Sequence, residues 1–135
     1  KVHAALARHT QQHHHPLKPP VAIISGGECT VTLRNPGVGR GGRCSEFLLS
    51  LAIDLDEREN IFALACDTDG IDGSEDNAGA YLEPGSLRRA RLGGLQPKAL
   101  LRDNDAFGFF APLDDLIFTG PTRTNVNDYR AILVL

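Results

Sequence analysis

Residues 44–66, CSEFLLSLAIDLDERENIFALAC, decide the expected fold because a helix pattern is followed closely by a strand pattern. Apolar residues recur at helical spacing from Cys44 to Glu57, which predicts one long helix with a wide apolar face. The next apolar run, Ile61–Cys66, is short and predicts a buried strand. A wide apolar helix beside a buried strand is typical of an α/β domain.

Two more strands are expected upstream of the helix. Val21–Ser25 is a short apolar run bounded by prolines and glycines. Glu28–Arg34 alternates between apolar and polar residues, which indicates a half-exposed strand. Gly26 and Gly27 join the two segments, which predicts a hairpin or a close bend there.

The first 20 residues are expected to be a helix end followed by a linker. Apolar positions in Lys1–His9 fall near one helical face. Residues 13–20, HHHPLKPP, contain three prolines, which favours a linker. The three adjacent histidines could hold a metal, but no carboxylate or cysteine accompanies them at ligand spacing, so a solvated linker is favoured.

Shorter elements are expected downstream. Ser86 is a candidate cap for a helix over Leu87–Leu92, and Pro97 is placed to open another helix. Leu116–Phe118 and Tyr129–Leu135 are predicted strands. Strands that alternate with helices predict a layered α/β sandwich, and the early alternating strand favours a mixed β-sheet.

Composition limits the possible partners and location. The 135 residues suit one folded domain, expected over residues 21–135, with 41% hydrophobic and 23% charged residues. A net charge of −3 and the lack of a long apolar run argue against nucleic-acid and membrane partners. Three cysteines without C-x-x-C spacing fit a cytoplasmic protein. Because the sequence starts at Lys1 and has no Met, we expect it to be part of a longer protein.

Two glycine-containing loops follow the early strands. In the first, SGGE, Glu28 could bind a metal or a hydroxyl group, although a turn also needs glycines. The second, residues 37–42, matches the dinucleotide fingerprint G-x-G-x-x-G, with Asp67 about two dozen residues later. The alternating strand before it, together with Arg40 and Arg43, favours a general anion site over a dinucleotide site, and a flexible turn remains the structural alternative.

Two polar loops follow the later strands. Asp67–Asp76 contains five carboxylates, but its spacing is wrong for an EF-hand, which leaves a magnesium or substrate-hydroxyl site or a solvated turn. Thr119–Asp128 is rich in hydroxyl and amide groups that could bind oxygens or simply turn the chain. Between these loops, Asp105 is a candidate helix cap. The phenylalanines that follow it, Phe107, Phe109 and Phe110, are expected in the core.

In this order the motifs resemble the MOFRL domain. They are SGGE followed by TVTL, GxGxGGR, EFLLSLA, DTDGIDG with NAGA, NDAFGFF and TGPTRTNVND, and together they extend from about Val21 to Leu135. This domain forms the C-terminal part of type II glycerate 2-kinases, including bacterial proteins named as hydroxypyruvate reductases of tartrate degradation. Each motif is weak alone, whereas the ordered set is specific.

The resemblance implies transfer of the ATP γ-phosphate to the 2-hydroxyl of D-glycerate or a related small hydroxy acid. ATP and Mg²⁺ would serve the complete enzyme, with no cofactor bound tightly to this domain alone. The implied cleft is shared with a larger N-terminal Rossmann-like domain, which this chain lacks, and a homodimer is possible. The isolated 135-residue chain is expected to fold without kinase turnover.

The resemblance also implies site residues. Its motifs assign catalytic roles to Arg43, Asp69 and Glu28, and substrate contacts to Gly41, Gly42, Asp72 and Asn125, with the metal position unassigned. Arg43 would stabilise phosphoryl or carboxylate charge. Glu28 and Asp69 would orient hydroxyls or the metal ion, or one of them would accept the hydroxyl proton.

Two cysteines depart from the family pattern. Relatives usually carry Asn at the place of Cys44 and Gly at the place of Cys66. A Cys at a helix start beside Arg43 is a conceivable reactive thiolate, although a passive substitution is favoured.

Two other functions stay open. An NAD(P)H-dependent hydroxypyruvate reductase would use the G-x-G-x-x-G loop, with Asp67 bound to the adenosine ribose. A non-catalytic module would recognise a small acid without converting it.

Overall fold

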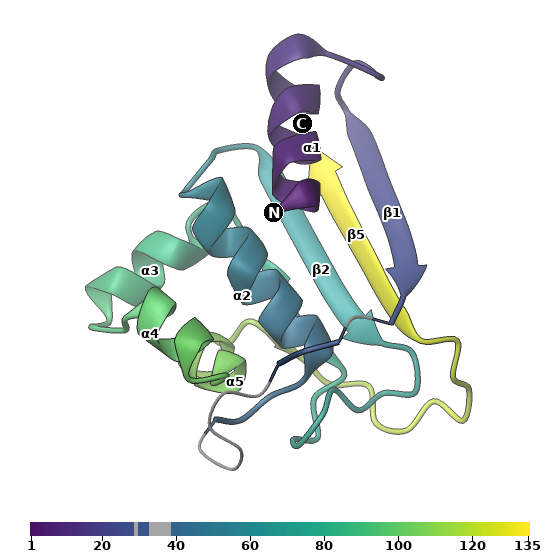
Figure 1. Ribbon diagram of the computed structural model, residues 1–135, viewed down its shortest axis with the longest axis vertical. Helices are drawn as coiled ribbons and strands as arrows, with labels where there is room; N and C mark the ends of the chain where they lie inside the picture. The colour runs from purple at the N-terminus through teal and green to yellow at the C-terminus, as the bar shows by residue number, and fades with distance from the viewer. Residues whose placement is uncertain (29, 33–38) are drawn as a thin grey trace.

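Five strands form one sheet in the computed structural model, which describes residues 1–28, 30–32 and 39–135 (Figure 1). The strands are β1 (Val21–Gly27), β2 (Ile61–Asp67), β3 (Gly79–Leu82), β4 (Leu116–Ile117) and β5 (Asp128–Val134). Their order across the sheet is β1-β5-β2-β3-β4. With its flanking helices the sheet confirms the predicted single α/β domain.

The prediction of a mixed sheet is wrong, because every strand pairing among the described residues is antiparallel. The last strand, β5, lies between β1 and β2 and runs antiparallel to both. The alternation in 28–34 had no bearing on strand direction. Residues 28 and 30–32 are not in a strand, and the rest of that expected strand, with the start of the glycine loop, lies outside the described residues.

The helices lie against one face of the sheet and beside it (Figure 1). They are α1 (Val2–His13), α2 (Arg43–Leu55), α3 (Ser86–Leu92), α4 (Pro97–Arg102) and α5 (Ala106–Phe110), followed by the 3₁₀ turn η1 (Ala111–Leu113). Helix α1 packs on β5, and α2 packs on β2 and β3. The short helices α4 and α5 pack against α2. None of the helices in the described parts of the chain is long and apolar enough to span a membrane.

Strand β5 shows how the sequence pattern selects the core face. Ile132 and Val134 are buried, whereas Tyr129 and Leu133 on the opposite face are 42% and 40% exposed. Alternate residues of a strand point to opposite faces, so the helices cover one face of this strand. Asp128 and Arg130 lie on the same face of β5 as these apolar core residues and are also buried.

Local predictions were partly corrected. Helix α1 continues to His13 and buries Ala4, Ala7 and Thr10, so residues 2–13 belong to the folded domain. Ser86 is the first residue of α3 and not its cap; its hydroxyl accepts the N–H of Glu83 and donates to buried Asp115. The cap prediction for Asp105 is confirmed by a bond from the N–H of Gly108. The core prediction is confirmed for Phe109 and Phe110, whereas Phe107 is only partly buried.

Candidate functional site

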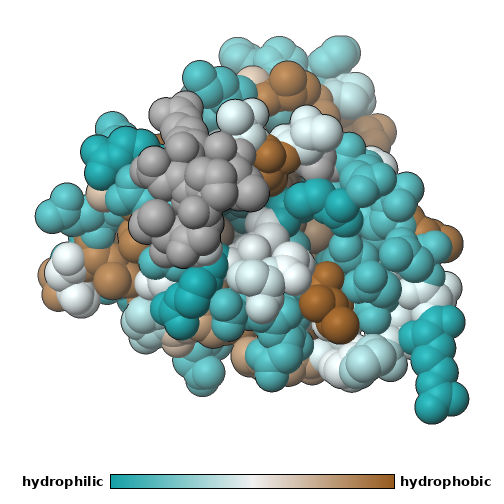
Figure 2. All heavy atoms as spheres, turned by 60° about the horizontal axis from the view of Figure 1, so that its bottom comes forward, coloured by the Kyte–Doolittle hydropathy of each residue, from teal (hydrophilic) through white to brown (hydrophobic). Residues whose placement is uncertain are grey.

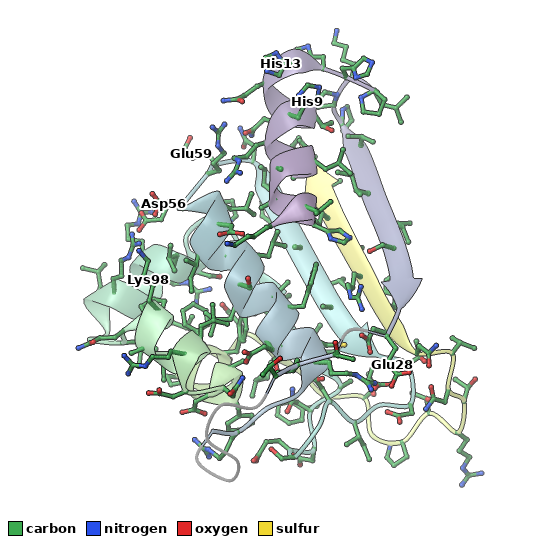
Figure 3. All side chains as sticks on the ribbon, in the orientation of Figure 1. His9, His13, Glu28, Asp56, Glu59 and Lys98 are labelled. Atoms are coloured by element: carbon green, nitrogen blue, oxygen red, sulfur yellow. The ribbon has the colours of Figure 1, made fainter. Side chains whose placement is uncertain are left out.

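Arg43, the first residue of α2, contacts three carboxylates at one end of the sheet. Its Nη1 lies 2.5 Å from Glu28 Oε1, and its Nη2 lies 2.8 Å from Asp67 Oδ2 and 3.3 Å from Asp128 Oδ1. These acids follow β1, end β2 and begin β5, and Figure 3 shows Glu28 at this end of the strands. The antiparallel position of β5 brings its first residue beside the last residues of β1 and β2.

Burial differs among the three carboxylates. The side chains of Asp67 and Asp128 are 7% and 0% exposed, whereas that of Glu28 is 57% exposed. Partial burial alone would lower the pKa of Arg43, but Asp128, Glu28 and Asp67 outweigh it and raise that pKa above the usual value. Arg43 therefore stays cationic, with Glu28 as its solvent-accessible partner.

Buried Arg130 extends this group. Its Nη2 donates to Asp128 Oδ2 at 2.6 Å and to the carbonyl oxygen of Gly27 at 3.2 Å, and its guanidinium lies 5.0 Å from the ring centre of Phe47. We call Glu28, Arg43, Asp67, Asp128 and Arg130 the Arg43 cluster. Three carboxylates and two guanidiniums leave it with one net negative charge.

The N-terminus of α2 is occupied by a carboxylate of the protein itself. Asp72 accepts the N–H of Cys44 at 2.9 Å and that of Ser45 at 2.8 Å, and it is 1% exposed. Burial raises the pKa of Asp72 despite the hydrogen bonds from Ser45 and Cys44. The structure thus places Asp72 beneath the helix, where it fills the anion position that the glycine loop predicted.

Asp69 and Asn125, two of the expected site residues, lie together in a pair of loops. Asp69 Oδ1 accepts the N–H of Ile71 at 2.9 Å, and Asn125 Nδ2 donates to Asp69 Oδ2 at 3.4 Å. The N–H of Thr122 donates to the Asp69 carbonyl oxygen at 3.0 Å. The acidic loop is therefore positioned by the loop over residues 119–127.

A cavity of about 560 Å³ lies beside Arg43. Its lining includes the expected site residues Glu28, Gly41, Gly42 and Arg43, and it does not include Asp69 or Asn125 among the described residues. Figure 2 shows this end of the molecule, where hydrophilic side chains predominate over scattered hydrophobic ones. Among the described residues of its lining, Arg43 is the cation, beside the carboxylates of Glu28 and Glu46. A guanidinium at the wall of a cavity can bind a small organic anion.

The Arg43 cluster does not fit a resident magnesium ion. Each of its carboxylates already contacts a guanidinium group. Within residues 1–28, 30–32 and 39–135, no three His, Cys, Asp or Glu side chains are grouped so that they could hold a metal ion. The ring of His9 contacts those of His13 and His15, but the three do not form such a group. Figure 3 shows His9 and His13 far from Glu28.

Cys44 does not have the surroundings of a reactive thiolate. It is fully buried, and burial followed by the charges of Asp72, Asp128 and Asp67 raises its pKa far above the usual value. Burial also raises the pKa of Cys66 to about 11. Both thiols are neutral at physiological pH, so the reactive-thiolate hypothesis is wrong and the passive substitution is favoured.

Sequence reasoning did not assign Asp128 or Arg130 to the site. The segment DYRAILV contains a usable signal, because its alternation places both charged residues on the same side as Ile132 and Val134. Charged side chains on the core-facing side of a strand need buried hydrogen-bond or ion-pair partners. Asp67 was considered as a ribose ligand and as part of the acidic loop, but not as a partner of Arg43, which it contacts.

This chain is similar in sequence to known proteins over most of its length. A protein of Agrobacterium vitis named as a hydroxypyruvate reductase is 54% identical over 119 residues, which cover 88% of this chain and 31% of that protein. A D-glycerate 2-kinase of Thermotoga maritima is 39% identical over 113 residues, covering 84% of this chain and 27% of the kinase. The chain thus spans about a third of the length of these relatives.

The fold matches a solved structure closely. The crystal structure of glycerate kinase from Thermotoga maritima superposes with a TM-score of 0.94 at 34% identity, over 99% of this chain and 32% of that one. The family model described as the MOFRL family matches residues 21–128, which include every residue of the Arg43 cluster except Arg130. On this evidence, the chain belongs to the MOFRL family.

Proposed function

We propose that this chain is the C-terminal domain of a glycerate 2-kinase that transfers the ATP γ-phosphate to the 2-hydroxyl of D-glycerate. The cleft would be shared with an N-terminal Rossmann-like domain, a proposal supported by the greater length of the relatives. The observation that supports this proposal most directly is the position of Arg43, which three carboxylates hold at the wall of the cavity. The kinase names of matching proteins supply the reaction class.

Arg43 would bind the anionic part of the reaction. Its contact with exposed Glu28 is the one that an incoming anion can replace, while buried Asp67 and Asp128 keep the guanidinium in place. A guanidinium donates two parallel hydrogen bonds to a carboxylate or phosphoryl group. It would therefore orient glycerate or stabilise charge on the transferring phosphoryl group.

We assign the proton acceptor to Asp69 and hydroxyl orientation to Glu28. The Glu28 carboxylate already accepts a hydrogen bond from the Arg43 cation at 2.5 Å. Among the described contacts, the Asp69 carboxylate receives hydrogen bonds only from neutral groups, the N–H of Ile71 and the amide of Asn125. Asn125 would thereby orient Asp69. ATP and Mg²⁺ belong to the complete enzyme in this proposal, and no residue of this domain is assigned to either.

The reductase alternative has support in the names of relatives but not in the glycine loop. A dinucleotide would place its pyrophosphate at the N-terminal amides of α2, which Asp72 occupies. It would also need Asp67 for a ribose, whereas Asp67 contacts Arg43. A non-catalytic small-acid module would use the same cavity and differ only in turnover.

The deciding experiment uses the complete protein encoded by the gene. ADP release would be followed with D-glycerate, ATP and Mg²⁺, and NADH oxidation with hydroxypyruvate in parallel. We expect ADP release that falls by a factor of about 10²–10³ in Arg43→Ala. The control Arg91→Ala removes surface ion pairs with Asp56 and Glu57 and should keep full activity.

Each outcome selects one function. NADH oxidation without ADP release would replace the kinase by the reductase. Glycerate binding without either reaction would indicate the non-catalytic module. The isolated 135-residue chain is expected to fold and to release no ADP, because it lacks the proposed N-terminal domain.

A further inference from the structure

Arg130 occupies a position where the strand pattern calls for an apolar residue. It lies on the helix-covered face of β5, two residues before Ile132, and is 5% exposed. Its buried Nε has no hydrogen-bond partner among the described residues. Apolar residues often stabilise a fold as well as a buried ion pair does, so fold stability alone explains this arginine poorly.

The contacts of Arg130 lead to Arg43 through one carboxylate. Asp128 Oδ2 accepts from Arg130 Nη2 at 2.6 Å, while Asp128 Oδ1 lies 3.3 Å from Arg43 Nη2. The two oxygens of one buried carboxylate thus join the two guanidiniums. Arg130 also donates to the carbonyl oxygen of Gly27, directly before Glu28, the exposed partner of Arg43.

The other side of Arg130 is fixed by packing. Its guanidinium lies over the ring of Phe47 in α2, one turn after Arg43. That ring meets His3 of α1 edge-on at 5.1 Å, and His3 Nε2 lies 2.9 Å from Ser25 Oγ in β1. Arg130 is therefore held between two helices and the edge strand and has little freedom to move.

We infer that Arg130 is a positioning residue that fixes Asp128 and thereby sets the direction in which Arg43 presents its guanidinium to the substrate. This inference rests on the proposed function of Arg43. Without Arg130, the Asp128 carboxylate can turn both oxygens toward Arg43, because a bidentate pair is the favoured geometry. The guanidinium is then drawn inward, away from Glu28 and the cavity.

The test compares variants of the complete protein encoded by the gene. Arg130→Met removes the charge at similar length, Arg130→Lys keeps the charge with a single point donor group, and Asp128→Asn removes the carboxylate charge. The double variant Asp128→Asn/Arg130→Met completes a double-mutant cycle, which measures the coupling between the two residues. Arg89→Met is the matched control, since Arg89 pairs with buried Asp115 at 2.7 Å outside the Arg43 cluster.

We expect kcat to fall roughly 10- to 100-fold in Arg130→Met, because small misplacements of a reacting group cost this much. KM for D-glycerate should change much less, and Arg130→Lys should restore part of kcat. The double variant should lose no more activity than the worse single variant, since Arg130 acts through Asp128. Arg89→Met should lower the urea midpoint of unfolding while kcat is retained.

Unchanged kcat in folded Arg130→Met, or losses that multiply in the double variant, would overturn the inference. Side-chain NMR signals of the Arg43 guanidinium give a readout that needs no reaction. We expect them to shift and broaden in Arg130→Met and to stay unchanged in Arg89→Met. A wild-type protein that releases no ADP would refute the proposed function, whereas identical Arg43 signals in Arg130→Met would refute the positioning role alone.

Discussion

The carboxylate of Asp72 occupies the space in which any side chain on Gly42 would begin. A Cβ atom on Gly42 would overlap Asp72 Oδ1 and the Asp72 backbone. The same carboxylate accepts the N–H groups of Cys44 and Ser45 at the start of α2. The glycine at this place is thus a steric requirement of an internal helix cap, and it tells little about an external ligand.

Gly42→Ala should destabilise the domain by about 2–4 kcal/mol. The new methyl group displaces the buried Asp72 cap and overpacks the loop contact. Urea unfolding measures the change. The control is Gly85→Ala, where a Cβ meets no atom within 4 Å, and its cost should stay below about 1 kcal/mol. Equal effects of the two substitutions would contradict the steric explanation.

Asp72→Asn should lower the free energy of unfolding by about 1–3 kcal/mol at neutral pH, because the amide turns a donor toward one of two buried N–H groups. This loss of stability relative to wild type, the deficit of Asp72→Asn, should depend on pH. Burial raises the folded-state pKa of Asp72 above 3.8, so the folded protein binds the proton more tightly than the unfolded chain.

The sign follows from that difference in proton binding. As pH rises from 3.8 through the raised folded-state pKa, wild type loses stability relative to Asp72→Asn, and above that range the difference is constant. Urea unfolding of both proteins from acidic to neutral pH tests this. A deficit that shrinks on acidification would show that the pKa is lowered in the fold.

Asp69→Asn and Glu28→Gln should affect catalysis differently. If Asp69 accepts the hydroxyl proton, its amide variant loses about 10²–10⁴-fold in kcat. Glu28→Gln keeps hydrogen-bonding capacity for a hydroxyl and should chiefly raise KM for D-glycerate. Steady-state ADP release by the complete protein separates kcat from KM. The reverse ranking of the kcat losses would assign the base to Glu28.

The two described cysteines should be unreactive in the folded protein. Burial and nearby carboxylates raise the pKa of Cys44, and burial raises that of Cys66 to about 11. In a Cys29→Ser background, a thiol reagent at neutral pH should modify neither until urea unfolds the chain. Rapid modification of one thiol per chain before unfolding would contradict this prediction.

The sequence predicted elements best where local periodicity is strong. The expected helix Cys44–Glu57 and strand Ile61–Cys66 differ from α2 and β2 by one or two residues at their ends. Strand β3 has only four residues and its backbone packs against β2 at Gly79, so no local pattern announces it. The prediction of strand direction failed for a related reason, because strand pairing depends on contacts between residues that are distant in sequence.

The candidate site shows the same limit. Motifs pointed to Glu28 and Arg43, which are close in sequence and form an ion pair. Arg43 and Asp128 are 85 residues apart, and only the position of β5 between β1 and β2 brings them together. The family resemblance gave Asp72 a substrate contact, which stays a prediction. The hydrogen bonds of its carboxylate to the start of α2 could not be predicted, because they need the folded loop.

The place of β5 between β1 and β2 also governs when the site can form during synthesis. Strands β1 and β2 leave the ribosome early, but they share no hydrogen-bonded edge with each other and must wait for residues 128–134 to join them. Until then Arg43 lacks Asp128, and both strands expose unpaired edges. A chain that ends before this strand would therefore be prone to aggregate, whereas loss of the edge strand β4 would leave the pairing of β1, β5 and β2 intact.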